Sequence, residues 1–454
     1  MLIKITKSTN LILLFCITAI TFIFCQPTEQ TVATGHPEWA KDEIIYEVNI
    51  RQYSEAGTFN AFAEQLPRLQ KMGVGILWLM PINPIGVEGR KGTLGSYYAV
   101  KDYKAVNPEY GTLDDLKKLV GKTHELGMHV IIDWVANHTS PDNVWTKTHP
   151  EYYSKDSLGN FYPPVPDWHD VIDLNYDNKD LRTAMTDAMK YWVEECDIDG
   201  FRCDVASMVP NDFWKEAITE LKKVKHVFML AEASEAELHD AGFDMTYSWG
   251  LKDVMNDVAK GNKNAESIAE YFVKEQKNYK PDDYRMLFTT NHDENSWNGT
   301  AYERFGDGAN TFSVLCGTAK GMLLIYSGQE SKLNKQLQFF EKDPIEWDDY
   351  PLEGFYTKLA DVKKENKALW NGSQGGEMVR INTSNDEKIY AFYREKDGDK
   401  VIVILNLSGE DVSAAISNEI LQGNFKEIFT DSPESFYGSF NKNLKPWQYL
   451  VFVN

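Results

Sequence analysis

Apolar residues along the chain follow two alternating patterns. Short continuous apolar runs of strand length are separated by stretches such as 59–72 and 112–126, where apolar residues recur at helical spacing. Runs that are apolar on both faces, and are reached through a helix, are typical of a buried parallel sheet. Eight runs are therefore expected to be strands: 43–50, 75–82, 129–134, 200–205, 227–232, 243–247, 285–291 and 321–327.

The strand count decides the fold class. Eight strands alternating with helices favour an α/β fold of the (β/α)8 type, a TIM barrel, over an open doubly wound sheet. We expect this barrel to span 39–372. The segment 139–178, after the third strand, is too long for a plain loop and predicts a small insert subdomain. From residue 373 the helical pattern stops, and short runs separated by turns predict a C-terminal all-β sandwich over 373–454.

The N-terminal end has the pattern of an export signal. In 1–25, two lysines precede an apolar run that is too short for a spanning helix, and 26–38 is a polar linker. Cys25 closes the run and resembles the lipidated cysteine of a bacterial lipoprotein signal, with simple secretion as the alternative. We expect an extracytoplasmic protein that is secreted, periplasmic or anchored at the cell envelope by a lipid on Cys25.

Composition narrows the partners and cofactors. With 47 basic and 68 acidic residues the net charge is −21, which argues against nucleic acid as a partner. Outside the signal only Cys196, Cys203 and Cys316 remain, too few for a disulfide framework, and we expect them to be buried. No glycine-rich phosphate loop follows a strand, so no organic cofactor is expected. The sequence predicts no oligomeric state.

Polar residues gather where the expected strands end, which is where the chemistry of such a barrel collects. Alternation along the fourth strand places Arg202 and Asp204 on one face, where the guanidinium would keep Asp204 ionised. The polar residues at the ends of four strands are Asp133, Asn137 and His138, Arg202 and Asp204, Glu232, and His292 with Asp293.

Two carboxylates at one barrel mouth suit the cleavage of an acetal. The reaction needs one ionised carboxylate to attack the anomeric carbon and one protonated carboxyl to donate to the leaving oxygen. Asp204 suits the first role. Glu232 suits the second, because its strand is apolar, no cation is adjacent in sequence, and desolvation raises the pKa of a carboxyl. Asp293 would hold substrate hydroxyls, and His138 and His292 would bind them as neutral imidazoles.

Each of these residues also has a structural explanation when it is taken alone. Asp133 could cap a helix or brace Arg202, the histidines could be satisfied core residues, and Glu232 could be a solvated strand end. Their joint placement favours an active site. A metal-hydrolase interpretation is weaker, because the histidines lack the compact spacing of metal ligands.

Four short segments carry a family resemblance. In order, they are Asp133-Trp134-Val135-Ala136-Asn137-His138, Gly200-Phe201-Arg202-Cys203-Asp204, Ala231-Glu232-Ala233 and Asn291-His292-Asp293-Glu294. They resemble the four motifs of the α-amylase family, glycoside hydrolase family 13, and the resemblance covers roughly residues 39–454. It implies Asp204 as nucleophile, Glu232 as general acid and base, and Asp293 as transition-state stabiliser. It also implies that the attacked glucose contacts Tyr98, His138, Arg202 and His292, with Tyr98 as its stacking platform.

The resemblance implies an exported retaining hydrolase of α-1,4 bonds in starch or malto-oligosaccharides. Ala206-Ser207-Met208 stands where many relatives have Lys-His, and Val205 also occurs in relatives that act on α-1,6 bonds or cyclic dextrins. An α-1,6-acting, transglycosylating or cyclodextrin-degrading enzyme is therefore the alternative. A non-catalytic starch-binding surface protein is the alternative from another class. Asn137 matches a family calcium ligand, and the sequence assigns no partner ligands to it.

Overall fold

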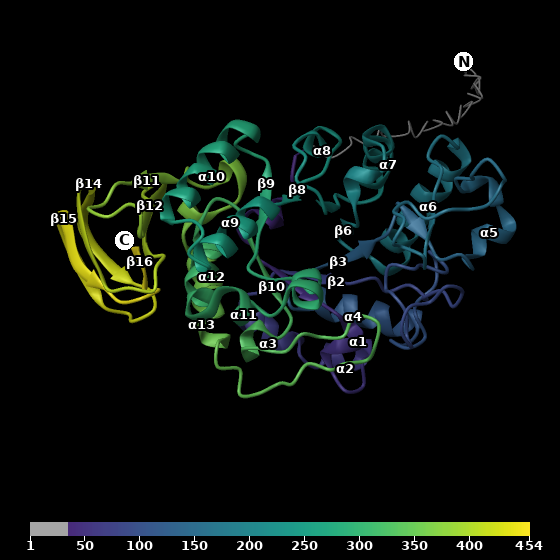
Figure 1. Ribbon diagram of the computed structural model, residues 1–454, viewed down its shortest axis with the longest axis horizontal. Helices are drawn as coiled ribbons and strands as arrows, with labels where there is room; N and C mark the ends of the chain where they lie inside the picture. Colours follow the sequence, from purple (N-terminus) through teal and green to yellow (C-terminus); the bar gives the residue numbers. More distant parts are fainter. Residues whose placement is uncertain (1–34) are drawn as a thin grey trace, which may run out of the picture. The chain divides into compact units, whose positions relative to one another are not determined.

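The computed structural model describes residues 35–454, and its centre is a closed barrel of eight parallel strands (Figure 1). Their order around the barrel is β1-β10-β9-β8-β7-β6-β3-β2. The strands are β1 Ile45–Val48, β2 Ile76–Leu79, β3 His129–Trp134, β6 Gly200–Cys203, β7 Phe228–Ala231, β8 Met245–Tyr247, β9 Tyr284–Leu287 and β10 Met322–Tyr326. All eight expected strands are present, and the predicted (β/α)8 barrel is confirmed. The predicted export signal and Cys25 lie outside the described residues.

Helices cover the outside of the barrel between successive strands. The first crossover is broken into two helices: α2 ends at Ala63 and α3 begins at Leu66, with Pro67 in the first turn of α3. The helices are α1 Ile50–Tyr53, α2 Phe59–Ala63, α3 Leu66–Lys71, α4 Leu113–Glu125, α5 Val144–Thr148, α6 Lys179–Cys196, α7 Asn211–Val224, α8 Glu237–Asp240, α9 Trp249–Ala259, α10 Ala265–Asn278, α11 Ala301–Phe305, α12 Ala309–Thr318 and α13 Glu353–Glu365.

The barrel interior changes from apolar to polar along the strands. Near the strand starts the inward side chains are apolar, as with Ile45 and Ile76. One layer further toward the C-terminal ends, three inward side chains are charged and fully buried: Glu47, Asp133 and Arg202. Because burying charge is unfavourable unless it is compensated, this layer must be internally paired.

The insert after β3 begins inside the site region. Its two short strands, β4 His138–Thr139 and β5 Ile172–Asp173, pair antiparallel. The hydroxyl of Tyr176 donates to the carbonyl of Ala136 at 2.7 Å and ties the insert to the end of β3. The insert therefore places His138 and the segment near residue 170 beside the barrel mouth.

The C-terminal domain is a single antiparallel sheet in the order β11-β12-β13-β16-β14-β15, which confirms the all-β prediction. Phe436 of β15 lies 5.1 Å from Phe452 of β16, although β14 lies between these strands in the hydrogen-bonded order. One sheet therefore curves over itself and encloses the core expected of a sandwich. Its strands are β11 Val379–Ile381, β12 Ile389–Lys396, β13 Asp399–Asn406, β14 Val412–Glu427, β15 Pro433–Leu444 and β16 Tyr449–Val453.

Arg394 joins this sheet to the barrel domain through backbone carbonyls, and Lys363 makes similar contacts within the barrel domain. Arg394 of β12 donates to the carbonyls of Ala319 and Trp370, each at 2.8 Å, and of Gly376 at 2.9 Å. Lys363 of α13 donates to the carbonyls of Gly321 and Leu369, each at 2.9 Å. Burial lowers the pKa of Arg394 to about 9 and that of Lys363 well below its usual range. Carbonyl oxygens, rather than carboxylates, compensate both charges.

Replacement of the Arg394 side chain tests this junction. We expect Arg394→Met to lower the free energy of unfolding by about 2–4 kcal/mol, because several buried carbonyls lose a charged donor at once. Lys388→Met is the control: it removes a surface ion pair with Glu410 and should change stability by less than about 1 kcal/mol. Urea denaturation at neutral pH measures both, and equal losses would exclude Arg394 as an anchor.

Candidate active site

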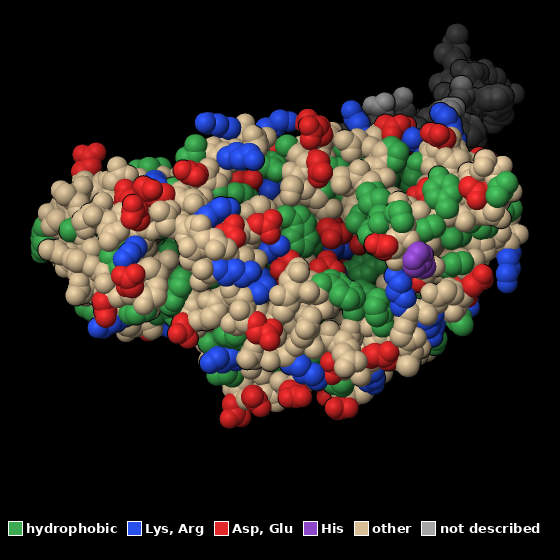
Figure 2. Space-filling view, in the orientation of Figure 1, with side chains coloured by type: hydrophobic (Ala, Val, Ile, Leu, Met, Phe, Trp, Pro, Cys, Tyr) green, Lys and Arg blue, Asp and Glu red, His purple; other side chains and the backbone are tan. Residues whose placement is uncertain are grey.

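A cavity of about 290 Å³ opens where the barrel strands end. Figure 2 shows a hollow in the molecular surface with acidic side chains at it and hydrophobic side chains around it. Six of the predicted site residues line the cavity: Tyr98, His138, Asp204, Glu232, His292 and Asp293. The structure thus brings together residues from four strand ends and one loop, while the seventh, Arg202, lies beneath them and is fully buried.

Arg202 contacts three carboxylates at once. Its Nη1 donates to Asp133 at 2.9 Å and to Asp204 at 3.1 Å, and its Nη2 lies 3.0 Å from Glu232 Oε2. The register explains the first contact, since Asp133 and Arg202 are direct neighbours across β3 and β6. Nε donates to the Tyr247 hydroxyl at 3.1 Å. One guanidinium therefore sets the positions of the nucleophile candidate and the acid candidate together.

Asp133 braces this arrangement from below, one of the roles expected for it. Besides Arg202, it accepts hydrogen bonds from the Trp78 indole and the Tyr98 hydroxyl, each at 3.1 Å. Burial raises the pKa of Asp133 to about 6, against the opposing charge of Arg202. Asp133 is fully buried, so it orients other groups and does not face the cavity.

The environments of the two central carboxylates differ from the sequence expectation. Burial, followed by the neighbouring Glu232, raises the pKa of Asp204 well above its usual range, and Arg202 only partly opposes this. The expectation that Arg202 alone keeps Asp204 ionised is therefore wrong for the substrate-free site. No cation is adjacent to Glu232 in sequence, as stated, but Arg202 reaches it from the neighbouring strand. Asp204 and Glu232 are thus linked through their shared contact with Arg202.

Val205 links the same pair through its backbone. Its N–H donates to Glu232 Oε2 at 2.8 Å, and its φ of 37° lies in the left-handed region. A β-branched residue rarely adopts this conformation, and such strain concentrates at functional sites. The strained turn directly after Asp204, the nucleophile candidate, thus points the Val205 N–H at Glu232, the acid candidate.

His292 is charged, contrary to the expectation of a neutral imidazole. Its Nδ1 pairs with the fully buried Glu47, and its Nε2 lies 2.8 Å from the Tyr98 hydroxyl and 3.3 Å from Asp293 Oδ2. Burial lowers the pKa of His292, but the charges of Asp293 and Glu47 outweigh it and raise the pKa to about 9. At neutral pH this residue offers two donors and a positive charge.

His138 behaves as expected. It is buried, and burial lowers its pKa to about 4, so the imidazole is neutral at physiological pH. Its Nε2 lies 4.0 Å from Asp204 Oδ2, and the Trp168 ring meets its edge at 5.4 Å. His138 thus flanks the nucleophile candidate as a neutral hydrogen-bonding group.

Asn137 stays a predicted calcium ligand, on the family resemblance alone. Its amide nitrogen lies 3.3 Å from His138 Nδ1. Within residues 35–454 no three His, Cys, Asp or Glu side chains are placed to hold a metal ion. Calcium requires six to eight oxygen ligands, so no chemical step is assigned to it.

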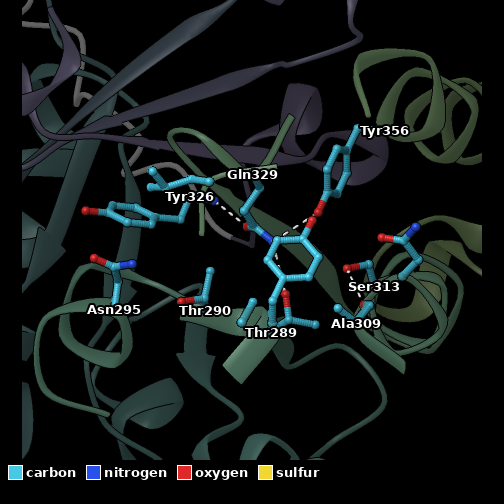
Figure 3. Close-up of a pocket in the computed structure, with 12 residues that line it drawn as sticks. Thr289, Thr290, Asn295, Ala309, Ser313, Tyr326, Gln329 and Tyr356 are labelled. Atoms are coloured by element: carbon cyan, nitrogen blue, oxygen red, sulfur yellow. Dashed lines mark hydrogen bonds between the residues drawn. The ribbon is translucent and has the colours of Figure 1, made fainter. Parts of the chain in front are cut away.

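A small polar cavity of about 20 Å³ lies behind the segment that carries His292 and Asp293 (Figure 3). Gln329 crosses it and donates to the Thr289 hydroxyl and the Tyr356 hydroxyl, each at 3.0 Å, while accepting from the Tyr326 N–H at 2.7 Å. The cavity volume is enough for about one water molecule. These bonds fix the end of β9 and hence the position of the motif that follows it.

Sequence reasoning missed Glu47 and most of the cavity wall. Glu47 lies within an ordinary strand pattern, and its partner is 245 residues away in sequence. The wall also contains Lys91, which pairs with Asp170 at 2.9 Å. Aromatic residues complete it: Trp168, Trp297, Phe339 and Phe340. The one sequence signal that could point to such a wall is the aromatic content of 13%.

Comparison with known families decides the classification. The family model described as "Alpha amylase, catalytic domain" matches residues 41–170 and 159–401, and the "Alpha amylase, C-terminal all-beta domain" model matches 381–449. The chain belongs to the α-amylase family, glycoside hydrolase family 13. The Cys196, Cys203 and Cys316 thiols are free and buried, as expected.

Individual α-amylase relatives agree over most of the chain. "Alpha-amylase 3" from Dictyoglomus thermophilum is 28% identical, over 88% of this chain and 91% of its own length. A maltosyltransferase from Picrophilus torridus, named for α-1,4-glucan and maltose 1-phosphate, is 27% identical over 79% of this chain and 60% of its own. The crystal structure of a maltogenic α-amylase from Thermotoga neapolitana superposes with a TM-score of 0.84 at 31% identity, covering 91% of this chain and 99% of that one.

The charged state of His292 can be measured directly. In ¹⁵N-histidine NMR spectra we expect His292 to titrate near pH 9, and Glu47→Gln to lower its pKa because one of two raising charges is lost. The pKa is raised in the folded state, so this interaction contributes fully to stability below about pH 6.5 and is lost as the pH rises through about 9. His138, neutral above about pH 4, is the internal control. Titration of His292 near pH 6.5 in both proteins would contradict the assignment.

Proposed function

We propose that this α-amylase family enzyme is a retaining hydrolase of α-1,4-glucosidic bonds in starch or malto-oligosaccharides. The observation that carries the proposal is the pairing of Asp204 and Glu232 at neighbouring strand ends, both in contact with one buried arginine. A nucleophile and a proton donor fixed against each other are the requirement for retaining glycoside cleavage.

In the first step a carboxylate oxygen of Asp204 attacks C1 of the bound glucosyl unit. The bond between C1 and the glycosidic oxygen breaks, and its electrons go to that oxygen, which takes the proton of Glu232. A covalent glucosyl ester on Asp204 remains, and the shortened sugar leaves with a new hydroxyl group. The charged His292 and the carboxylate of Asp293, both in the cavity wall, are placed to bind hydroxyl groups of the attacked ring.

In the second step water replaces the departed sugar. Glu232, now ionised, takes a proton from the water, and the water oxygen attacks C1 while the ester bond to Asp204 breaks. Two inversions at C1 give a product with the α configuration. Glu232 ends protonated and Asp204 ionised, so the site is ready for another turn.

The first step needs an ionised Asp204 and a protonated Glu232, whereas burial in the substrate-free site favours a proton on Asp204. There the Arg202 guanidinium and the Val205 N–H both contact Glu232 Oε2, and burial favours a proton on Asp204. We propose that a sugar placed against Glu232 displaces these contacts, which leaves Arg202 to Asp204 and transfers the shared proton to Glu232. Substrate binding thereby prepares the acid and the nucleophile together.

A sugar acceptor in place of water is the second candidate outcome. The similarity to a maltosyltransferase and the aromatic side chains in the cavity wall favour it, because apolar walls exclude water and bind sugar faces. Cleavage of α-1,6 bonds or cyclic dextrins uses the same two carboxylates. A non-catalytic binding protein is disfavoured, since Asp204, Glu232 and Asp293 are all present in one cavity.

We further propose that the enzyme acts outside the cytoplasm, on the basis of the export pattern of residues 1–25. None of the helices within residues 35–454 is long and apolar enough to cross a membrane. Lipid attachment at Cys25 remains a prediction of the sequence. Mass spectrometry of the membrane fraction would detect a lipidated N-terminus beginning at that cysteine.

The central experiment is proton NMR of maltoheptaose with the purified enzyme. Wild type should release products whose new reducing ends are α anomers before mutarotation, and Asp204→Asn should be slower by roughly four orders of magnitude or more. Near-ultraviolet circular dichroism checks that the variant is folded. Release of β anomers, or full activity of a folded Asp204→Asn protein, would refute the mechanism. Longer products would reveal a sugar acceptor, and panose and pullulan test α-1,6 cleavage.

The coupling of the two carboxylates predicts a shift in pH dependence. Glu232→Gln removes a charge that raises the pKa of Asp204, so Asp204 should stay ionised to lower pH. α-Glucosyl fluoride suits the measurement, because its fluoride leaves with little acid assistance. We expect the acid limb of single-turnover fluoride release to lie at lower pH in Glu232→Gln than in wild type. An unchanged limb, or one at higher pH, would show that the carboxylates titrate independently.

A further inference from the structure

Trp297 is an unusually exposed aromatic side chain in the cavity wall. It is 55% exposed, although tryptophan is mostly buried in folded proteins, and it follows the candidate stabiliser Asp293 by four residues. It lies on a π-helical turn, Glu294–Asn298, a rare conformation that occurs frequently at functional sites. No assigned role in the cleavage step accounts for this exposure.

The exposed ring stands on a firmly held segment. The buried Asn295 donates to the carbonyl of Lys335 at 3.0 Å and accepts from the N–H of Leu337 at 2.9 Å. On the other side of the turn, the buried Glu294 pairs with Lys252 at 3.0 Å and with Arg304 at 3.3 Å. The turn is therefore fixed on both sides, and the exposure of Trp297 is not a consequence of a loose loop.

Two phenylalanines extend the apolar surface. The ring centroids of Phe339 and Phe340 lie 5.3 and 5.9 Å from that of Trp297, tilted by 41° and 55°. Neither ring stacks face to face on the indole, and more than half of the Trp297 surface stays exposed beside them. Phe339 is also nearly parallel to Tyr98, with an angle of 11° between the rings. We call Trp297, Phe339 and Phe340 the aromatic shelf.

We propose that the aromatic shelf is a second sugar-binding subsite, next to the subsite of the attacked glucose, and that it binds a further glucosyl unit of an α-glucan chain. The inference rests on the proposed function. The shelf and the carboxylates line one continuous cavity, so a chain bound at Asp204 extends along its wall. The apolar face of a glucosyl ring removes the exposed indole from water, while its hydroxyl groups stay solvated.

The fixed turn makes this subsite preorganised. Binding a sugar there requires no ordering of the segment, so little of the stacking free energy is lost. The shelf thus adds affinity for chains, and it contributes nothing to substrates that fill only the subsite of the attacked glucose. Chain length, rather than the chemical step, is the property that depends on Trp297.

Two substrates separate this role from a structural one. α-Glucosyl fluoride fills only the subsite of the attacked glucose, whereas maltoheptaose also reaches the shelf. We expect Trp297→Ala to lower kcat/KM for maltoheptaose by on the order of tenfold, mainly through KM, and to leave α-glucosyl fluoride turnover unchanged. Trp297→Phe should stay within about threefold of wild type on both, because a flat ring remains. Tyr437→Ala, which removes an 82% exposed ring on β15, is the control and should change neither.

Three outcomes would overturn the subsite. Equal losses on both substrates would show that Trp297 acts by positioning Asp293. Unchanged kinetics on both would show that no sugar stacks there, and a loss in Tyr437→Ala would show a nonspecific effect.

Should wild type cleave neither substrate, the proposed function fails, and calorimetry of maltoheptaose binding still tests whether the aromatic shelf binds sugar. Affinity roughly tenfold weaker in Trp297→Ala than in wild type supports the subsite, and equal affinity or no binding refutes it.

Discussion

The buried Arg202 guanidinium is the constraint on which the active site depends. A fully buried positive charge requires carboxylates around it, and here three of them come from the ends of three adjacent strands. The barrel supplies this geometry, because its parallel register places Asp133 directly beside Arg202, and Asp204 follows two residues further along the chain. A single interaction thereby stabilises the polar layer of the barrel and sets the spacing of the reacting groups.

The same constraint couples the ionisation of the site. Arg202 contacts Glu232 as well as Asp204, so a change of charge on one carboxylate alters the electrostatic environment of the other. A second charged group, His292, lies between Glu47 and Asp293, whose carboxylates compensate its buried charge in the same way. The mouth of the barrel is therefore a network of alternating charges, and a bound sugar acts on the whole network rather than on one residue.

The sequence was sufficient for the barrel and the catalytic candidates, because both depend on local patterns. Strand and helix periodicity located eight strands, and the candidates Asp204, Glu232 and Asp293 were identified by their position at the expected strand ends. Prediction from the sequence failed where the partner of a residue is distant along the chain. His292 looked neutral because nothing near it marked Glu47 as a partner, and Glu232 looked isolated because Arg202 reaches it from another strand. The aromatic shelf escaped notice because Trp297 stands on an irregular turn with no periodic signal.

The junction between the barrel and the C-terminal sheet has a different electrostatic character. The charge of Arg394 is met by backbone carbonyls, none of which takes up a proton in the ordinary pH range. An ion pair loses its attraction when acid neutralises its carboxylate, but a cation bound by carbonyls does not. Acidification therefore leaves the Arg394 contacts intact, whereas it weakens the carboxylates of the active site and the surface ion pairs at the same junction, such as Lys358 with Asp431.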